Sequence, residues 1–143
     1  MESDDTARSM LERFLRIAPC RETDSKDIYR IGDLARDFDV SLRTLRFYED
    51  RGLLIPDRTG QTRLYSRSDR RRLKLILLAK GIGFSLGDIQ KLLDFYDGKP
   101  NNGSAGDIIL KKFRRQLETL QSQKAEVEKS IANLTNAIEL ITE

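Results

Sequence analysis

Residues 41–65 read SLRTLRFYEDRGLLIPDRTGQTRLY, and this stretch decides the fold. Ser41 is a favourable N-cap for a short helix, because its hydroxyl can accept a hydrogen bond from the first helical turn. Gly52 can adopt the left-handed conformation that commonly ends a helix. The turn-forming residues around Gly60 then predict two short strands. The stretch therefore predicts a short helix followed by a wing.

Positive charge is concentrated around this stretch. From Arg43 to Arg72 the chain contains nine arginines, no lysine and four acids. Residues 1–27 have a net charge of −2, residues 28–99 of +5, and residues 100–143 of zero, within a total of +3. Guanidinium groups stay charged and match phosphate oxygens and guanine edges. This localised charge favours a nucleic-acid partner.

A second short helix is predicted directly before residues 41–65. Its apolar positions recur at i, i+3, i+4 and i+7. They are Ile31, Leu34, Ala35 and Phe38. After a turn at Asp39–Val40, the next helix would direct Leu42, Leu45 and Tyr48 inward. Two short helices joined by such a turn form a helix-turn-helix, whose second helix approaches base edges in the major groove.

Two more helices are predicted after the wing. Ser68 is expected to cap the first, and Gly81 and Gly83 to end it. Its first turn, residues 69–72, is strongly basic, which is unfavourable near the positive end of a helix dipole. We therefore expect these arginines to contact phosphates, although a solvated charged turn is the alternative. Ser85 is expected to cap the second helix.

The clearest periodicity lies near the C-terminus, after a linker predicted at residues 98–106. Ten positions alternate by steps of three and four, and one of them, Lys124, is polar. These seam residues are Leu110, Phe113, Leu117, Leu120, Lys124, Val127, Ile131, Leu134, Ile138 and Ile141. A heptad seam of this length predicts a coiled coil and hence a homodimer. A parallel pair would place two Lys124 side chains together, so an antiparallel pair is the better fit.

Residues 1–27 form an N-terminal extension with apolar residues at helical spacing. They are Met10, Leu11, Phe14, Leu15, Ile17 and Ala18. The extension is either an amphipathic helix that docks on the body or a partner, or a partly ordered tail. The predicted domains are thus residues 1–27, a winged helix-turn-helix at 28–97, the linker at 98–106, and the coiled coil at 107–143.

Composition argues against several other classes of protein. There is one cysteine, Cys20, and no histidine, so neither an internal disulfide nor a cysteine- and histidine-rich metal site is expected. No apolar run reaches about 18 residues, the length that would predict a membrane span. Acids at Glu2, Asp4 and Asp5 do not fit a secretory signal. We expect a cytoplasmic, mainly α-helical protein without cofactor, metal or enzymatic activity.

Several blocks of sequence, in order, resemble the mercury-resistance-regulator (MerR) family over about residues 28–96. They are Tyr29–Ala35, Thr44–Glu49, Gly52–Leu54 with Pro56, Arg63–Tyr65, the helix with Asp69, Leu73 and Ile76, and Gly83–Leu86 leading to Ile89 and Leu92–Leu93. The resemblance implies a bacterial transcription regulator that binds inverted-repeat promoter operators as a homodimer. It also implies that the protein bends and untwists the DNA for RNA polymerase.

The resemblance and the wing together give the candidate DNA-binding residues. Those expected in or beside the major groove are Arg43, Thr44, Arg46 and Phe47. Those expected to grip the backbone or hold the wing are Tyr48, Arg58, Arg63, Tyr65 and Arg67. Arg70 and Arg71 are expected to reach phosphates from the next helix.

The sequence departs from the family pattern in three places. Phe47 replaces the usual tyrosine, and Gln61–Thr62 replaces the usual Asn-Gly of the wing turn. The cysteines of metal-sensing members are missing after the long helix, which suggests a short form without an effector domain. Its target genes, its inducer and the direction of regulation do not follow from the sequence. An architectural protein that bends DNA without regulating one promoter is the alternative function.

Overall fold

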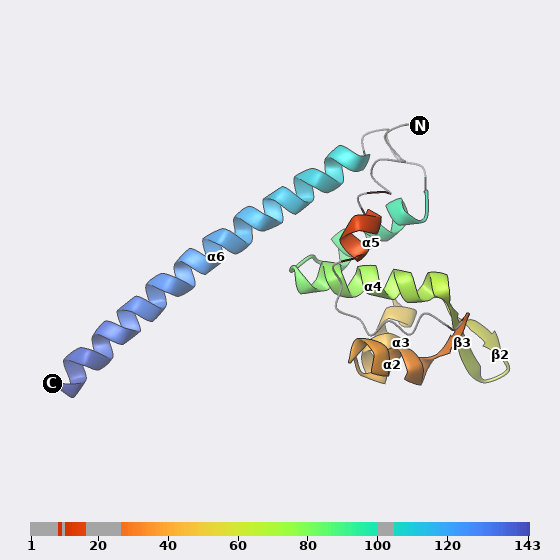
Figure 1. Ribbon diagram of the computed structural model, residues 1–143, viewed down its shortest axis with the longest axis horizontal. Helices are drawn as coiled ribbons and strands as arrows, with labels where there is room; N and C mark the ends of the chain where they lie inside the picture. The colour runs from red at the N-terminus through yellow and green to blue at the C-terminus, as the bar shows by residue number, and fades with distance from the viewer. Residues whose placement is uncertain (1–8, 10, 17–26, 100–104) are drawn as a thin grey trace. The chain divides into compact units, whose positions relative to one another are not determined.

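The computed structural model describes residues 9, 11–16, 27–99 and 105–143 (Figure 1). The chain divides into two compact units, Met1–Gly106 and Asp107–Glu143. The elements are β1 (Ile28–Arg30), α2 (Ile31–Phe38), α3 (Leu42–Asp50), β2 (Asp57–Thr59), β3 (Thr62–Ser66), α4 (Arg67–Gly81), α5 (Leu86–Tyr96) and α6 (Ala105–Thr142). The fold is mainly helical with one small sheet, as the sequence predicts.

The sheet is antiparallel, with strand order β1-β3-β2. β2 and β3 form a hairpin in which Arg58 pairs with Arg63, and Gly60 in its turn has a φ of 67°. This hairpin confirms the predicted wing. β1 pairs with the other edge of β3 and places Tyr29 opposite Tyr65, both of them buried. The sequence did not predict β1, because three residues are too few to show the alternation of a strand.

α2 and α3 form the predicted helix-turn-helix. Asp39 ends α2 with a φ of 52°, in the left-handed region that aspartate tolerates better than most residues. The Oγ of Ser41 then accepts a hydrogen bond from the backbone N–H of Thr44 at 3.1 Å. This N-cap fixes where α3 begins.

Two of the three α3 side chains predicted to face inward are buried in the core. Leu45 and Tyr48 are buried, as predicted, but Leu42 is 41% exposed, so the prediction that it faces inward is wrong. Helical side chains lean toward the N-terminus of their helix. Because Leu42 is the first residue of α3, its side chain extends past the end of the helix.

α4 is capped differently from the prediction. It begins at Arg67, and its N-cap is Ser66 rather than Ser68. The Oγ of Ser66 accepts a hydrogen bond from the N–H of Asp69 at 3.1 Å, and the Asp69 carboxylate accepts one from the N–H of Ser66 at 2.9 Å. This capping box needs an acid or amide three residues after the cap. Ser68 has Arg71 at that position, which explains why Ser66 is used.

The remaining helix boundaries follow the predicted signals. α4 ends at Gly81, and Gly83 has a φ of 90°. The Oγ of Ser85 caps α5 by accepting a hydrogen bond from the N–H of Asp88 at 3.1 Å. The largest fully buried side chains of the core are Leu11, Tyr29, Leu34, Leu45, Tyr48, Leu54, Tyr65, Leu73, Leu75, Ile76, Ile89 and Leu92.

Part of the N-terminal extension is helical. Residues 11–15 form a helical turn in which Leu11 and Leu15 are buried, which favours the amphipathic-helix alternative for this short segment. Met10, Ile17 and Ala18 of the predicted stripe lie outside the described residues.

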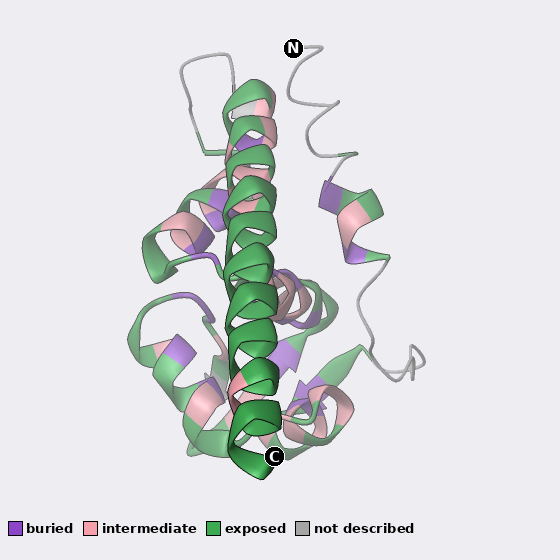
Figure 2. Cartoon of the chain, turned by 90° about the vertical axis from the view of Figure 1, so that its left-hand side faces the viewer, coloured by how far each residue is buried: buried purple, intermediate pink, exposed green. Residues whose placement is uncertain are grey.

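α6 is a single helix of 38 residues. Figure 2 shows that most of its surface is exposed. The seam residues from Leu117 onward are exposed, including Val127 at 57%, Ile131 at 58% and Leu134 at 63%. At a rise of about 1.5 Å per residue the helix is roughly 57 Å long. An apolar stripe of this length, left open to solvent, is typical of an interaction surface. None of the described helices is long and apolar enough to cross a membrane.

Candidate nucleic-acid interface

The outer face of α3 has three of the four side chains predicted to approach base edges. Arg43, Arg46 and Phe47 are exposed, and Thr44 is partly buried. The Thr44 hydroxyl shares a hydrogen bond of 2.9 Å with the Ser41 hydroxyl, so part of its capacity is used by the helix cap. The face thus combines two exposed guanidinium groups with one aromatic ring, a combination suited to base edges and phosphates.

The carboxylate of Glu49 links the wing to α3. Its Oε1 accepts a hydrogen bond from the Tyr65 hydroxyl at 2.5 Å, and its Oε2 lies 3.0 Å from the Nε of Arg63. The Glu49 side chain is only 6% exposed. Both partners belong to β3, so the carboxylate joins α3, the candidate reading helix, to the wing. Burial raises the pKa of Tyr65, and the hydrogen bond to Glu49 raises it further.

The sequence did not predict this role of Glu49. In the sequence, Glu49 is only one of the four acids that offset the charge of the nearby arginines. Tyr65 and Arg63 are predicted to grip the DNA backbone or to hold the wing. Tyr65 is 1% exposed and therefore holds the wing instead of contacting a ligand. Tyr48 is also 1% exposed, so direct backbone contact is not available to it. The side chain of Arg58 lies outside the described part of the wing.

The arginines at the start of α4 have different surroundings. Arg71 is exposed, and Arg67 is exposed with its Nε 3.3 Å from Oδ1 of Asp27. Arg70 is 5% exposed, so the prediction that it reaches phosphates is at odds with the structure. Its guanidinium lies over the rings of two residues, Tyr29 at 5.6 Å and Phe38 at 5.1 Å.

Burial of Arg70 is explained by these contacts and by one acid. Its Nε lies 3.9 Å from Oδ2 of Asp37, which supplies a partly buried opposite charge. The flat guanidinium group is weakly hydrated and stacks well on aromatic faces. Arg70 therefore joins α4 to β1 and α2 and is a structural residue.

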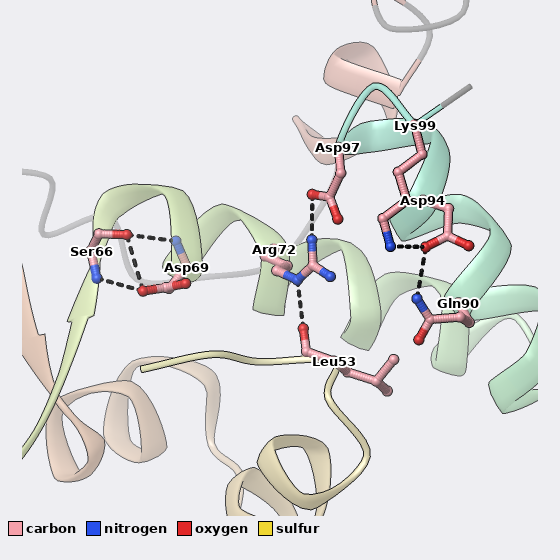
Figure 3. Close-up of polar contacts among 8 residues, drawn as sticks. All are labelled: Leu53, Ser66, Asp69, Arg72, Gln90, Asp94, Asp97 and Lys99. Atoms are coloured by element: carbon pink, nitrogen blue, oxygen red, sulfur yellow. Dashed lines mark hydrogen bonds and ion pairs between the residues drawn. The ribbon is translucent and has the colours of Figure 1, made fainter. Parts of the chain in front are cut away.

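Figure 3 shows a second polar junction, which is centred on Arg72. Its Nε donates to the carbonyl oxygen of Leu53 at 2.5 Å, and its Nη1 donates to Oδ1 of Asp97 at 2.5 Å. The side chain is 12% exposed. One arginine thus links the loop after α3 to the end of α5.

Asp94, on α5, is the centre of a neighbouring cluster of polar side chains (Figure 3). Its Oδ1 accepts hydrogen bonds from Gln90 at 2.9 Å and from Lys99 at 3.1 Å. Burial alone would raise the pKa of Asp94, but these two hydrogen bonds and the lysine charge outweigh it and lower the pKa. Asp94 therefore stays ionised and holds the turn that follows α5.

An open cavity of about 460 Å³ lies between the start of α2 and the wing turn. Its lining includes Arg30, Arg36, Arg63 and Gln61, together with Asp33. Arg36 donates to Asp33 at 2.7 Å. Sites for small organic molecules are mostly apolar, so this lining suits water or phosphate better. Among the described residues, no group of three or more cysteine, aspartate or glutamate side chains is placed to hold a metal ion.

Comparison with known proteins shows which family the chain belongs to. The model of the MerR HTH family regulatory protein matches residues 29–96, and the model described as MerR, DNA binding matches residues 70–137. The HTH-type transcriptional regulator ZntR of Escherichia coli K12 is 33% identical over 113 residues, which span 77% of this chain and 80% of that protein. The chain belongs to the MerR family. It is a DNA-binding transcription regulator.

Other members of the MerR family agree with this assignment. The mercuric resistance operon regulatory protein of Pseudomonas fluorescens is 34% identical over 99 residues, covering 66% of this chain and 69% of that one. The transcriptional activator Mta of Bacillus subtilis is 38% identical over 98 residues, but the match spans only 38% of that longer protein. The architectural alternative is not favoured, because these relatives are transcription regulators.

Two solved structures of the family share the fold. A MerR-family transcriptional regulator from Bacillus cereus superposes with a TM-score of 0.64 and 27% identity, over 76% of this chain and 78% of that one. HiNmlR, described as a MerR family regulator lacking the sensor domain and bound to promoter DNA, gives a TM-score of 0.57 and 26% identity, over 73% and 78% of the two chains.

Proposed function

We propose that this MerR-family regulator binds a pseudo-palindromic operator as a homodimer, with one α3 in the major groove of each half-site. The observation that carries the proposal is the exposed face of α3, where Arg43, Arg46 and Phe47 stand on a capped helix in helix-turn-helix geometry. In this geometry the recognition helix approaches base edges. The two arginines would bond to guanine edges or to phosphates beside them.

The wing and the start of α4 would contact the DNA backbone. Arg63 is half-buried against Glu49 and would support the wing, while Arg67 and Arg71 are exposed and would reach phosphates. Arg58 is proposed for the same role from its place in β2. Contacts of this kind set the register of the protein on DNA and read little sequence.

A second copy of the chain is proposed to cover the apolar stripe of α6. In an antiparallel pair, seam positions that face one another sum to 251. The layers are then Leu110 with Ile141, Phe113 with Ile138, Leu117 with Leu134, Leu120 with Ile131, and Lys124 with Val127. Every apolar residue meets an apolar one or the methylene stem of a lysine, whose ammonium can reach water. Lys124 Nζ already lies 3.9 Å from Oε1 of Glu128 on its own helix, at the edge of this central layer.

Two proposals about mechanism rest on the family. The dimer would bend and untwist an operator that lies between promoter elements, which realigns those elements for RNA polymerase. Such binding gains part of its specificity from the deformability of the DNA. Residues 28–97 would act as the reading domain and residues 107–143 as the dimerisation helix, in the cytoplasm of a bacterium.

Selection of bound duplexes from a random pool tests the DNA-binding part of the proposal. We expect an enriched inverted repeat whose affinity for the protein falls steeply as salt rises. Replacing Arg46 by alanine is expected to weaken binding to this repeat about ten-fold or more, since a good arginine–base contact is worth roughly 1–3 kcal/mol. Fluorescence anisotropy with a labelled duplex measures the change.

Lys129→Ala is the matched control for Arg46→Ala. It removes the same charge from an exposed site on α6, away from the seam. We expect it to bind the repeat with nearly unchanged affinity. Equal weakening by both variants would mean that Arg46 acts only through net charge, and selection of no repeat at all would refute the proposal.

Crosslinking tests the antiparallel orientation. Leu120→Cys and Ile131→Cys are made separately in a Cys20→Ser background and treated with a short bismaleimide. In the antiparallel pair, position 120 of one copy faces position 131 of the other, while the two residues 120 lie about 16 Å apart. We therefore expect efficient crosslinking only when the two variants are mixed. Crosslinking of the Leu120→Cys protein with itself would show a parallel pair.

A further inference from the structure

Phe47 is an exposed aromatic ring on the reading helix. It is 40% exposed, whereas the neighbouring Tyr48 is 1% exposed. Residues three and four apart share one face of a helix, so Phe47 lies between Arg43 and Arg51 on the outer side of α3. A large apolar side chain here exposes hydrocarbon to water, in the middle of a face that is otherwise suited to a polyanion.

The ring of Phe47 is held in place on the free protein. The guanidinium of Arg51 lies over it, 5.2 Å from its centroid. The ring of Tyr48 lies 5.9 Å away at a tilt of 54°, and Tyr48 is itself fixed in the core. Phe47 therefore needs little further ordering when it binds a partner, which lowers the entropic cost of the contact.

The chemistry of the ring limits what it can recognise on DNA. Phenylalanine has no hydrogen-bonding group, so it can neither donate to a phosphate nor pair with a base edge. In the major groove the distinctive apolar group is the C5-methyl of thymine, which makes contacts with apolar side chains. Arg43 and Arg46 on the same helix would supply the polar contacts around it.

We propose that Phe47 reads the C5-methyl group of thymine at a defined position in each operator half-site. The inference deepens the proposed function, because it requires that α3 lies in the major groove. It assigns the ring a part in sequence selection that the two arginines cannot perform. The same contact would also accept the methyl group of 5-methylcytosine, since both methyl groups occupy the same position in the groove.

A deoxyuridine scan of the selected repeat tests the proposal. Each thymine is replaced in turn by deoxyuridine, which removes the methyl group and leaves base pairing unchanged. We expect one or two positions per half-site at which the wild-type protein loses about three- to five-fold in affinity, the effect of one buried methyl group. Phe47→Ala is expected to bind the thymine-containing repeat more weakly and to be insensitive to deoxyuridine at those positions.

Two further variants make the result specific. Ile55→Ala truncates another exposed apolar side chain, which lies outside α3, and should keep the full sensitivity to deoxyuridine. Phe47→Leu keeps apolar bulk at the site and should keep part of the sensitivity. Circular dichroism and thermal melting confirm that each variant is folded. When a sensitive T·A pair is changed to C·G, methylation of that cytosine should raise the affinity of the wild type compared with unmethylated cytosine, and should not do so for Phe47→Ala.

The outcomes separate this inference from the proposed function. If the wild type binds its repeat but no deoxyuridine weakens binding, the proposal for Phe47 fails and DNA binding stands. Equal deoxyuridine sensitivity in the wild type and Phe47→Ala also overturns it, because the methyl group then contacts another residue. If the wild type binds no duplex, both proposals fail.

Discussion

Replacing Leu117 by aspartate is expected to make the protein monomeric. Leu117 is 56% exposed on α6 and belongs to the apolar seam. In the proposed dimer it packs against Leu134 of the second copy, and the two-fold symmetry repeats this layer at both ends. The substitution would therefore bury two carboxylates without partners, at a cost of several kcal/mol each. We expect the dimer dissociation constant to rise at least about 1,000-fold, since each factor of ten corresponds to 1.4 kcal/mol.

Sedimentation velocity over a range of concentrations measures this change, and operator binding reports its consequence. A monomer contacts one half-site, so affinity for the full repeat should fall steeply. Leu140→Asp is a matched control, because Leu140 is 75% exposed on the same helix but lies outside the seam. It should remain dimeric. If both variants behave alike, or if Leu117→Asp stays a dimer, the seam is not the interface.

The features that could be predicted from the sequence depend on residues close together in the chain. The helix-turn-helix follows from four apolar residues at helical spacing within an eight-residue segment and from the cap at Ser41. The wing follows from the turn around Gly60. The extent of α6 follows from a heptad pattern in which one position of ten, Lys124, is polar. In each case the interactions that define the element lie within a few residues of one another, so the pattern is visible in the sequence.

The features that were missed depend on contacts between distant segments. β1 is only three residues long and becomes a strand because Tyr29 pairs with Tyr65. Arg70 sits in a basic turn that looks solvent-exposed, but α4 packs so that its guanidinium lies over the rings of Tyr29 and Phe38. The three arginines of residues 70–72 are alike in type, but helical spacing distinguishes them, because Arg70 is three residues before the buried Leu73 and shares its face. The two rings that make its burial favourable come from the elements packed against the helix.

Glu49 is the strongest example of a residue whose importance appears only in the folded chain. Among substitutions of single polar residues, we expect the loss of Glu49 to destabilise the reading domain most. Glu49→Ala removes the acceptor of the Tyr65 hydroxyl and the counter-ion of Arg63. A buried hydroxyl and a largely buried guanidinium are then left without this partner. We expect the free energy of unfolding to fall by about 2–4 kcal/mol. For a domain of this size, that corresponds to a decrease in Tm of roughly 10–20 °C.

Two milder variants divide the effect of Glu49→Ala between its two contacts. Glu49→Gln keeps an oxygen that accepts from Tyr65 but removes the charge that faces Arg63. Tyr65→Phe removes the hydroxyl and leaves the ion pair, and is expected to cost about 1 kcal/mol, the usual value for one hydrogen bond. Chemical denaturation gives all three values. A smaller loss for Glu49→Ala than for Tyr65→Phe would contradict the role assigned to this carboxylate.

The pH dependence of stability gives an independent check on the Tyr65 contact. The pKa of Tyr65 is raised in the folded protein, so the hydroxyl keeps the proton that it donates to Glu49. Its contribution to stability is therefore complete below about pH 10, the ordinary pKa of tyrosine, and is lost at more alkaline pH. Tyr65→Phe should lack this alkaline loss. The same carboxylate fixes the wing to α3, so Glu49→Ala should also increase amide hydrogen exchange in β2 and β3. It should weaken operator binding as well, because the shape of the DNA-binding face depends on this contact.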